Sequence, residues 1–213
     1  MHWYYHVAVV MVKMLMLLLT RWDVRGKENV PSQGAVMIVA NHMNLADPPL
    51  LGVSLGRKAM FVAKKELFQF RPLASFMRGI GAFPISRGKI NTKAMRQANQ
   101  VLAQGQVLAM FPEGMRSYSA QLQPAFSGSA LIALRCCVPI IPVGIIGTEK
   151  FKGVSWMLRR PRIIVNIGHP FYLPSVNSRL TKERLAEHTD SIMRRIADLL
   201  PLEYRGHYAG EGN

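Results

Sequence analysis

Short apolar segments alternate with segments of helical spacing along most of the 213-residue chain, and this alternation is the feature that most restricts its fold. The short segments are rich in β-branched and other apolar residues, which is typical of buried strands. They are residues 35–40, 60–63, 83–86, 107–111, 140–145 and 163–167. The helical segments are residues 48–55, 66–77, 91–104, 127–136 and 181–200. Strands that alternate with helices build layered domains, so we predict an α/β fold with a mainly parallel central sheet flanked by helices.

The N-terminal segment, residues 1–21, differs in character from the rest of the chain. Its run VAVVMVKMLMLLL is apolar apart from Lys13. His6, Lys13 and Thr20 recur every seven residues and so lie along one stripe of a helix. The run is shorter than the about 20 apolar residues that a bilayer span requires, and aromatic residues flank it as they do at membrane interfaces. We predict a helix that lies in the membrane interface; a tilted single span and an ordinary core helix remain alternatives.

The charge of the chain narrows the choice of partners. With 27 Lys and Arg against 12 Asp and Glu, the formal net charge is +15. Such a surface favours anionic partners, which include acidic lipid, phosphorylated substrates and nucleic acid. The two cysteines, Cys136 and Cys137, are adjacent within an apolar stretch. This arrangement predicts a reduced, buried pair and argues against a disulfide framework.

Polar residues follow abruptly where the first of the predicted strands ends. In VANHMNLADPPLL, residues 39–51, the apolar run stops at Asn41 and His42, and Asp47 precedes two prolines. Ligands of open α/β sheets bind beyond the carboxyl ends of the strands, which is where His42 is expected. Asp47 suits the N-cap of the next helix, with the prolines in its first turn. Taken alone, the H-x4-D spacing is better explained by a polar turn and a helix cap than by a functional site.

Charged residues also follow three other predicted strands. They are Lys64, Arg87, Glu113 and Arg116, and the last two lie on either side of Gly114 in FPEGMRS. Each one alone is a common surface feature, but parallel strands bring their carboxyl ends to the same edge of a sheet. That edge would then hold a base with a carboxylate partner, together with cations suited to phosphate oxygens. These are the groups needed to activate a hydroxyl on a phosphorylated substrate.

Four ordered blocks of this chain resemble those of the glycerolipid acyltransferases. The blocks are NHMNLAD, GAFPISR, FPEGMRS and VPIIPVGI, and their order and spacing match over residues 20–170. The resemblance is closest to the bacterial 1-acyl-glycerol-3-phosphate (lysophosphatidic acid) acyltransferases, whose tails are also similar to LPLEYRGHY at residues 200–208. Two departures bear on acceptor or donor preference. Met115 stands where the family usually has a small hydroxyl residue, and Ser127 where relatives commonly carry lysine.

The resemblance implies a catalytic mechanism. An alcohol is a poor nucleophile near neutral pH, so a base must take its proton as it attacks. His42 would do this for the free hydroxyl of lysophosphatidate, while Asp47 would fix the ring tautomer and stabilise the imidazolium. The thioester of acyl-CoA or acyl carrier protein would be attacked directly, giving phosphatidate and a free thiol. No enzyme nucleophile is needed for this reaction.

The remaining expectations also come with this resemblance. The acceptor phosphate would be held by Lys64, Arg87 and Arg116, and supporting roles fall to Asn41, Glu113 and Gly114. Glu113 would order the site, and backbone N–H groups near Gly114 would stabilise the oxyanion. We expect residues 22–213 to form the acyltransferase domain and residues 1–21 to attach it to anionic lipid on the cytoplasmic face of the cell membrane. No cofactor and no metal are expected.

Three alternatives remain open. The acceptor of the same reaction can be glycerol-3-phosphate or another lyso-lipid. A basic, membrane-bound polyanion-binding protein would also use the net charge, although basic and aromatic residues are not interleaved as in nucleic-acid binders, so no nucleic acid is expected. A metal hydrolase is less well supported, because the usual ligand spacings are absent from the sequence.

Overall fold

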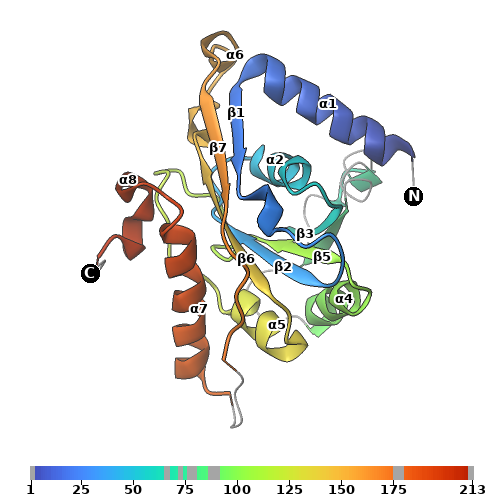
Figure 1. Ribbon diagram of the computed structural model, residues 1–213, viewed down its shortest axis with the longest axis vertical. Coiled ribbons are helices and arrows are strands. Elements are labelled where there is room, and N and C mark those ends of the chain that lie inside the picture. The colour runs from blue at the N-terminus through green and yellow to red at the C-terminus, as the bar shows by residue number, and fades with distance from the viewer. Residues whose placement is uncertain are drawn as a thin grey trace.

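The computed structural model describes residues 3–64, 68–71, 74–75, 81–85, 92–174 and 180–210. A seven-stranded sheet forms its centre, with helices on both faces (Figure 1). The strands are β1 Arg21–Arg25, β2 Val36–Ala40, β3 Ala59–Lys64, β4 Ala82–Ile85, β5 Val107–Met110, β6 Ile140–Ile146 and β7 Arg162–Ile167. The helices are α1 Trp3–Leu19, α2 Asp47–Ser54, α4 Thr92–Ala103, α5 Gly128–Cys136, α6 Trp156–Arg159, α7 Lys182–Ala197 and α8 Leu202–Arg205.

The sheet is mainly parallel, as the alternation predicts. Its strand order is β1-β7-β6-β2-β5-β3-β4. From β6 to β4 every neighbouring pair is parallel, whereas β7 runs antiparallel to β6 and carries β1 parallel to itself. The carboxyl ends of β2, β3, β4, β5 and β6 therefore share one edge, and polar residues that follow these strands meet there.

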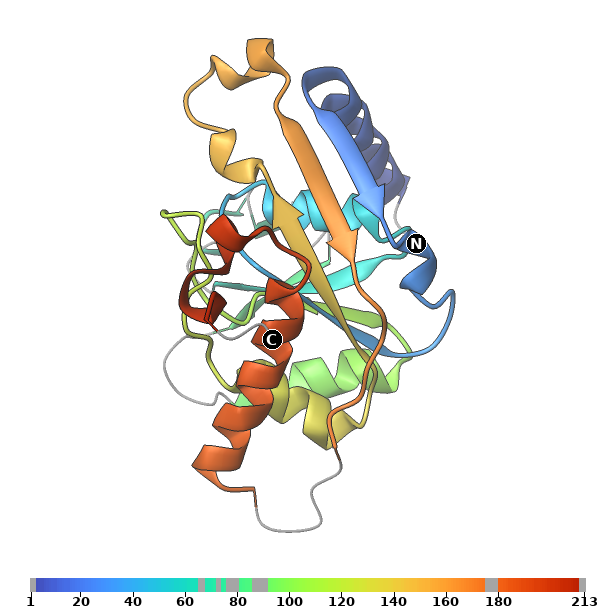
Figure 2. The same cartoon turned by 60° about the vertical axis from the view of Figure 1, so that its left-hand side comes forward.

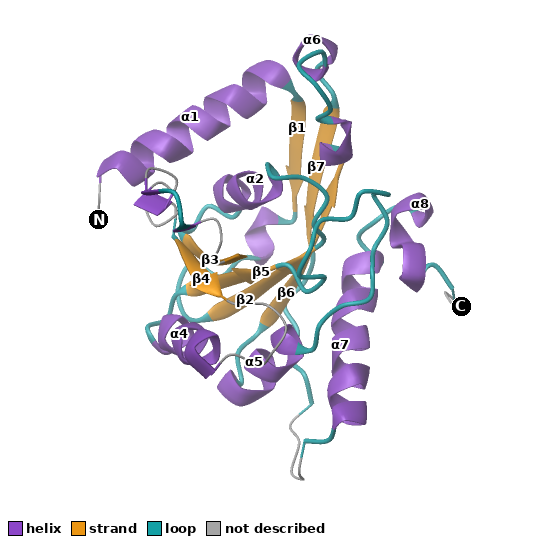
Figure 3. Cartoon of the chain, turned by 180° about the vertical axis from the view of Figure 1, so that it is seen from behind, coloured by secondary structure: helices purple, strands orange, loops and turns teal. Residues whose placement is uncertain are grey.

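Side chains of β2 alternate between two apolar layers, which explains why this strand is apolar throughout. Met37 and Val39 face the layer formed by α4, α5 and α7. Val36 and Ile38 face the opposite layer, to which α2 contributes Leu50 and Leu51. Figure 3 shows these two groups of helices on opposite sides of the sheet.

The N-terminal helix α1 lies against the domain on the α2 side of the sheet (Figure 1). Its Met16 is buried in the apolar layer that also holds Leu50 and Leu51 of α2. A row of apolar side chains on its outer face is exposed: Val7, Val10, Met11, Met14, Leu15, Leu17 and Leu18. Among the described residues, no helix is both long and apolar enough to cross a bilayer.

Several details differ from the sequence predictions. Strand β1, with the sequence RWDVR, has no apolar run to reveal it, because it is an edge strand with exposed charged ends. The expected burial of the cysteines is wrong: Cys136 is half-buried and Cys137 exposed, because they end α5 where the chain turns outward with a left-handed Cys137. The helix predicted over residues 66–77 lies largely outside the described residues.

Candidate active site

Asn41 fixes the point at which the chain leaves strand β2. Its side chain is buried and forms two hydrogen bonds with the backbone of Ile145 in β6. Its Nδ2 donates to the Ile145 carbonyl at 2.9 Å, and its Oδ1 accepts from the Ile145 N–H at 2.7 Å. Beyond the end of β2, the side-chain amide of Asn41 thus makes the two hydrogen bonds to β6 that a backbone peptide group would otherwise make. The next residue, His42, is thereby held at the edge of the sheet.

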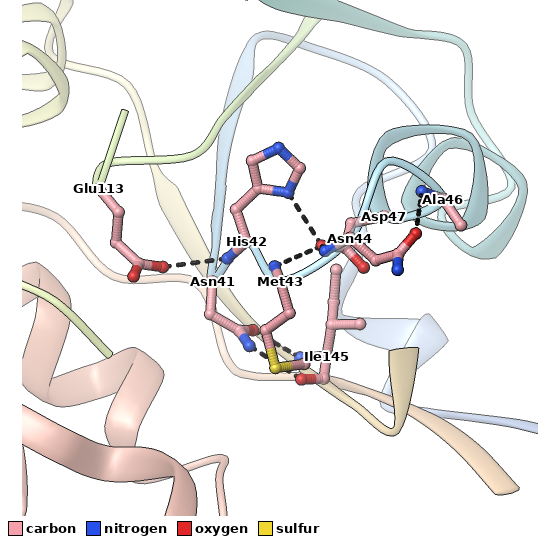
Figure 4. A network of polar contacts seen from close by, with 8 residues as sticks. All are labelled: Asn41, His42, Met43, Asn44, Ala46, Asp47, Glu113 and Ile145. Carbon is pink, nitrogen blue, oxygen red and sulfur yellow. Dashed lines mark hydrogen bonds and ion pairs between the residues drawn. The ribbon is translucent and has the colours of Figure 1, made fainter. Parts of the chain in front are cut away.

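The Asp47 carboxylate organises the loop that follows His42 (Figure 4). It is fully buried, and its Oδ2 accepts hydrogen bonds from the N–H groups of Met43 at 2.6 Å and Asn44 at 2.7 Å. The same oxygen lies 2.9 Å from Nδ1 of His42. A buried carboxylate requires such donors, because its lost hydration is otherwise uncompensated.

The predicted N-cap role of Asp47 is wrong. Ala46 is the N-cap residue of α2, and it makes no side-chain capping bond. Asp47 is instead the first residue of the helix, and its side chain turns back toward the loop because the Met43 and Asn44 amides and the His42 ring engage it. The predicted position of the two prolines is confirmed, since Pro occupies the first turn.

The His42 ring is held on two sides. Besides its contact with Asp47, it stacks on Phe111, with 4.3 Å between ring centroids and 25° between planes. Because carboxylate Oδ2 can only accept, we assign the hydrogen to Nδ1, which leaves a lone pair on Nε2. Nε2 has no hydrogen-bond partner within the described part of the chain, and in Figure 4 it points away from the network.

Glu113, in the turn that follows the neighbouring strand β5, holds the backbone of His42. Its side chain is buried; Oε1 accepts from the His42 N–H and Oε2 from the Gln123 N–H, both at 3.0 Å. Burial raises the pKa of the Glu113 carboxyl to about 7, although these two hydrogen bonds act in the opposite direction, and the nearby Asp47 adds to the rise. Glu113 is therefore positioned to brace the loops and does not point at the ring of His42.

The turn after Glu113 depends on Gly114. Its φ is +66°, and a Cβ at this position would come within 2.8 Å of the Phe126 ring. The Gly114 N–H donates to the Phe111 carbonyl, so this particular N–H is already used within the turn. Further on, the N–H of Ser117 donates to the His42 carbonyl at 2.7 Å. The turn is thus tied directly to the loop that carries His42.

Of the three predicted phosphate-binding residues, only Arg116 has a side chain that the structure describes. Arg116 lies within the turn, one residue before Ser117, and its Nη2 is 3.4 Å from the Tyr118 hydroxyl. Lys64 is the last residue of β3, at the expected edge of the sheet, and its side chain lies outside the described parts. Arg87 also lies outside the described residues. The guanidinium of Arg116 also lies 5.6 Å from the centroid of the Tyr118 ring.

Sequence reasoning missed the groups that hold His42 and Asp47 in place. Phe111 was identified only as the apolar end of a strand, and no sequence spacing reveals a ring stack. The C-terminal tail also contributes, since the Leu122 N–H donates to the Tyr204 carbonyl and the His207 N–H donates to the Leu122 carbonyl. Leu122 precedes Gln123, the second partner of Glu113, so the tail supports the loop that leads from the site.

No group of three or more potential metal ligands occurs among the described residues. Within the described part of the chain, the site provides an imidazole nitrogen without a hydrogen-bond partner and a buried carboxylate on the other side of the ring. Such an arrangement can remove a proton from a hydroxyl group and does not require an enzyme nucleophile.

Comparison with known proteins defines the class to which this fold and site belong. A family model described as Acyltransferase matches residues 21–146. This match covers more than half of the chain, which therefore belongs to the acyltransferase family and is an O-acyltransferase by class. The resemblance seen in the four sequence blocks is confirmed.

Particular relatives carry more specific names. The 1-acyl-sn-glycerol-3-phosphate acyltransferase of Bacillus subtilis (strain 168) is 29% identical over 189 residues, which is 88% of this chain and 92% of the relative. The enzyme of the same name from Streptococcus pneumoniae is 31% identical over 190 residues, covering 85% of this chain and 67% of the relative. The crystal structure of the 1-acyl-sn-glycerophosphate acyltransferase PlsC from Thermotoga maritima matches with a TM-score of 0.69 and 25% identity, covering 92% of this chain and 79% of that one.

The raised pKa of Glu113 predicts a pH-dependent stability. The unfolded carboxyl titrates near 4.5 and the folded one near 7, so the folded state retains the proton between these values. Because only the unfolded state loses the proton in this range, the free energy of unfolding falls as the pH rises from about 4.5 to about 7, with no further change above. Relative to Glu113→Gln, the wild-type free energy of unfolding should fall by roughly 2–3 kcal/mol between pH 5 and pH 8.

Urea denaturation at several pH values measures this difference. Glu187→Gln is the matched control, because Glu187 is exposed on α7 and should leave the pH profile unchanged. Parallel profiles for the wild type and Glu113→Gln would contradict the assigned titration.

Proposed function

We propose that this protein transfers an acyl group from a thioester donor, acyl-CoA or acyl carrier protein, to the free hydroxyl of 1-acyl-glycerol-3-phosphate, giving phosphatidate. The observation that carries the proposal is the His42 ring, whose Nδ1 is held 2.9 Å from Asp47 Oδ2 while Nε2 remains open. The names of the relatives from Bacillus subtilis and Streptococcus pneumoniae support the choice of acceptor.

In the proposed reaction, Nε2 of His42 takes the proton of the acceptor hydroxyl as its oxygen attacks the thioester carbonyl carbon. The tetrahedral intermediate then collapses, the carbon–sulfur bond breaks, and the imidazolium returns the proton to the departing sulfur. The products are an oxygen ester and a free thiol. Neither a cofactor nor a metal takes part in this scheme.

Asp47 stabilises the charged intermediate state of His42 in this scheme. Its carboxylate is fully buried, and its Oδ1 has no hydrogen-bond partner in the described part of the chain. When Nε2 gains a proton, the ring becomes a cation 2.9 Å from Oδ2. The hydrogen bond between a neutral ring and the carboxylate then becomes an ion pair in poorly hydrated surroundings. This change lowers the energy of the state in which the acceptor has lost its proton.

The acceptor phosphate is assigned to Arg116, with Lys64 and Arg87 as further cations. Arg116 belongs to the turn whose Ser117 N–H binds the His42 carbonyl, so a phosphate held by its guanidinium would lie near the open Nε2. Lys64 ends β3, a strand of the same parallel set as β2 and β5. A guanidinium can hold two phosphate oxygens at once, which also orients the acceptor.

The exposed face of α1 is the proposed membrane-attachment surface. Seven bulky apolar side chains along this helix are exposed, and Leu18 is 70% exposed. An apolar helix face of this kind, next to a strongly basic domain, suits insertion into the interface of an anionic bilayer. In this proposal residues 1–21 attach the acyltransferase domain, residues 22–213, to the cytoplasmic face of the cell membrane, where its lipid substrate resides.

His42→Ala should lower kcat by about 10²–10⁴-fold, because the general base is lost. Asp47→Asn should produce a loss of similar order, since it changes the hydrogen-bonding of the ring. The measurement is transfer of a radiolabelled acyl group from acyl-CoA or acyl carrier protein to a panel of lysophosphatidate, glycerol-3-phosphate and other lyso-lipids. Transfer to a different acceptor alone would overturn the substrate assignment while retaining the catalytic pair.

His169→Ala is the matched control for this test, because His169 is exposed and follows β7, outside the site. It should retain wild-type activity. Circular dichroism and vesicle binding should be unchanged in all three variants. Full activity in His42→Ala would remove His42 from the mechanism.

Arg116→Ala and Arg87→Ala should each raise the KM for lysophosphatidate about 10–100-fold, because a charge-assisted hydrogen bond to phosphate is lost. The KM for the acyl donor should change little. Steady-state kinetics with each substrate varied in turn provide the test, with the exposed Arg96→Ala on α4 as the matched control. An effect confined to the donor KM would show that the phosphate assignment is incorrect.

Met11→Asp combined with Leu18→Asp should release the protein from anionic vesicles, because two exposed side chains of the α1 row become charged. We expect the vesicle partition coefficient to fall at least about tenfold, as measured by flotation. Leu202→Asp on α8 is the matched control, since Leu202 is 68% exposed on another element. Equal flotation of the α1 variant and the wild type would contradict the attachment through α1.

A further inference from the structure

A second apolar protrusion lies at the same end of the molecule as the C-terminal end of α1. Residues 147–161 connect the antiparallel strands β6 and β7, and this connection, called the α6 tip below, extends past the sheet (Figure 2). Its base is ordered by the rings of Phe151 and Trp156, which stack with 4.1 Å between centroids and 27° between planes, and Phe151 also packs against the apolar layer on the α2 side. The tip is therefore a folded element with defined inner and outer sides.

The outer side of the α6 tip carries large apolar side chains that face solvent. Leu158 is 91% exposed and Val154 is 80% exposed, and Met157 beside them is also exposed. None of the three belongs to either apolar layer of the domain. Exposed apolar groups gathered on a folded projection are typical of a surface that binds another apolar phase.

Basic residues surround these apolar side chains. The segment KFKGVSWMLRRPR, residues 150–162, contains five Lys or Arg and no Asp or Glu. Lys152, Arg159 and Arg160 are exposed. Apolar side chains flanked by cations match the two layers of an anionic bilayer, whose acyl chains lie beneath a negatively charged headgroup region.

The α6 tip is joined directly to α1. Nη2 of Arg160 donates a hydrogen bond of 3.0 Å to the carbonyl of Leu17 in the last turn of α1. Figures 1 and 3 both show α6 beside the start of β1, where α1 ends. The exposed side chains of Leu17 and Leu18 thus lie at the end of α1 that contacts the tip.

We propose that the α6 tip is a second membrane-contact site that inserts Val154, Met157 and Leu158 into an anionic bilayer beside α1. Lys152 and Arg159 then bind lipid headgroups. This inference rests on the proposed attachment of α1 to the membrane. A single interfacial helix leaves the domain free to roll about the helix axis, whereas a second contact off that axis fixes the roll. The site at the edge of the sheet is then held in one orientation toward the bilayer.

The test compares two pairs of substitutions in the full-length protein. Val154→Ser with Leu158→Ser removes apolar contact, and Lys152→Gln with Arg159→Gln removes charge; Arg160 is left intact because it binds α1. Flotation is measured with vesicles of neutral phosphatidylcholine and with vesicles that also contain anionic phosphatidylglycerol. Leu202→Ser is the matched control, and it should float like the wild type.

We expect the Val154/Leu158 variant to bind both kinds of vesicle about tenfold more weakly. The Lys152/Arg159 variant should bind anionic vesicles less well and neutral vesicles unchanged, and added salt should abolish that difference. Wild-type flotation by the Val154/Leu158 variant would overturn the proposal. So would weakening by the charge variant alone, since that result indicates a general polyanion surface.

Acyl transfer to a short-chain, water-soluble lysophosphatidate separates this inference from the proposed function. The tip variants should keep wild-type rates with the soluble acceptor, because their changes lie outside the site. If the wild-type protein shows no transfer but the vesicle results are as expected, the proposed reaction fails and the membrane contact stands. A loss of transfer to the soluble acceptor in the Val154/Leu158 variant would overturn the tip proposal, since the tip would then act on substrate.

Discussion

The buried carboxylate of Asp47 is the group on which the site depends. A single oxygen, Oδ2, accepts hydrogen bonds from the backbone of Met43 and Asn44 and also contacts the His42 ring. The loop conformation and the orientation of the ring therefore have the same cause. Because the carboxylate is fully buried, its demand for donors is strong, and the loop satisfies that demand only when folded around it. A residue that at first suggests a helix cap instead determines where the His42 ring points.

The backbone on either side of this ring is fixed by two further buried side chains from different strands. Asn41 binds Ile145 of β6, and Glu113 after β5 binds the N–H of His42. Strand β2 lies between β5 and β6 in the sheet, so the two contacts hold His42 from both neighbours. Parallel pairing thus does more than gather polar residues at one edge. It places a supporting group on each side of the base.

Sequence patterns predicted the strands of the parallel sheet and the expected location of His42 and Arg116, because both follow from the alternation of apolar segments. They did not reveal β1, whose charged residues suit an edge position, or the stack of His42 on Phe111. A ring stack depends on side-chain directions across two strands, and no spacing along one chain encodes these directions. The cap role expected of Asp47 failed for a related reason. Local propensity favoured the helix end, whereas tertiary donors drew the carboxylate into the loop.

Helix α2 connects the loop that carries His42 to α1 on the outer surface of the molecule. Asp47 begins α2, and Leu50 and Leu51 of that helix pack in one apolar layer with Met16 of α1. The opposite face of α1 carries the exposed apolar row. Packed side chains of α1 and α2 therefore connect this row to the helix that begins with Asp47. If α1 lies in the bilayer interface as proposed, its depth there also sets how far the open Nε2 lies from the lipid headgroups. The packing of α1 on α2 would then serve both to stabilise the fold and to bring the base to the level of an acceptor hydroxyl that remains in the membrane.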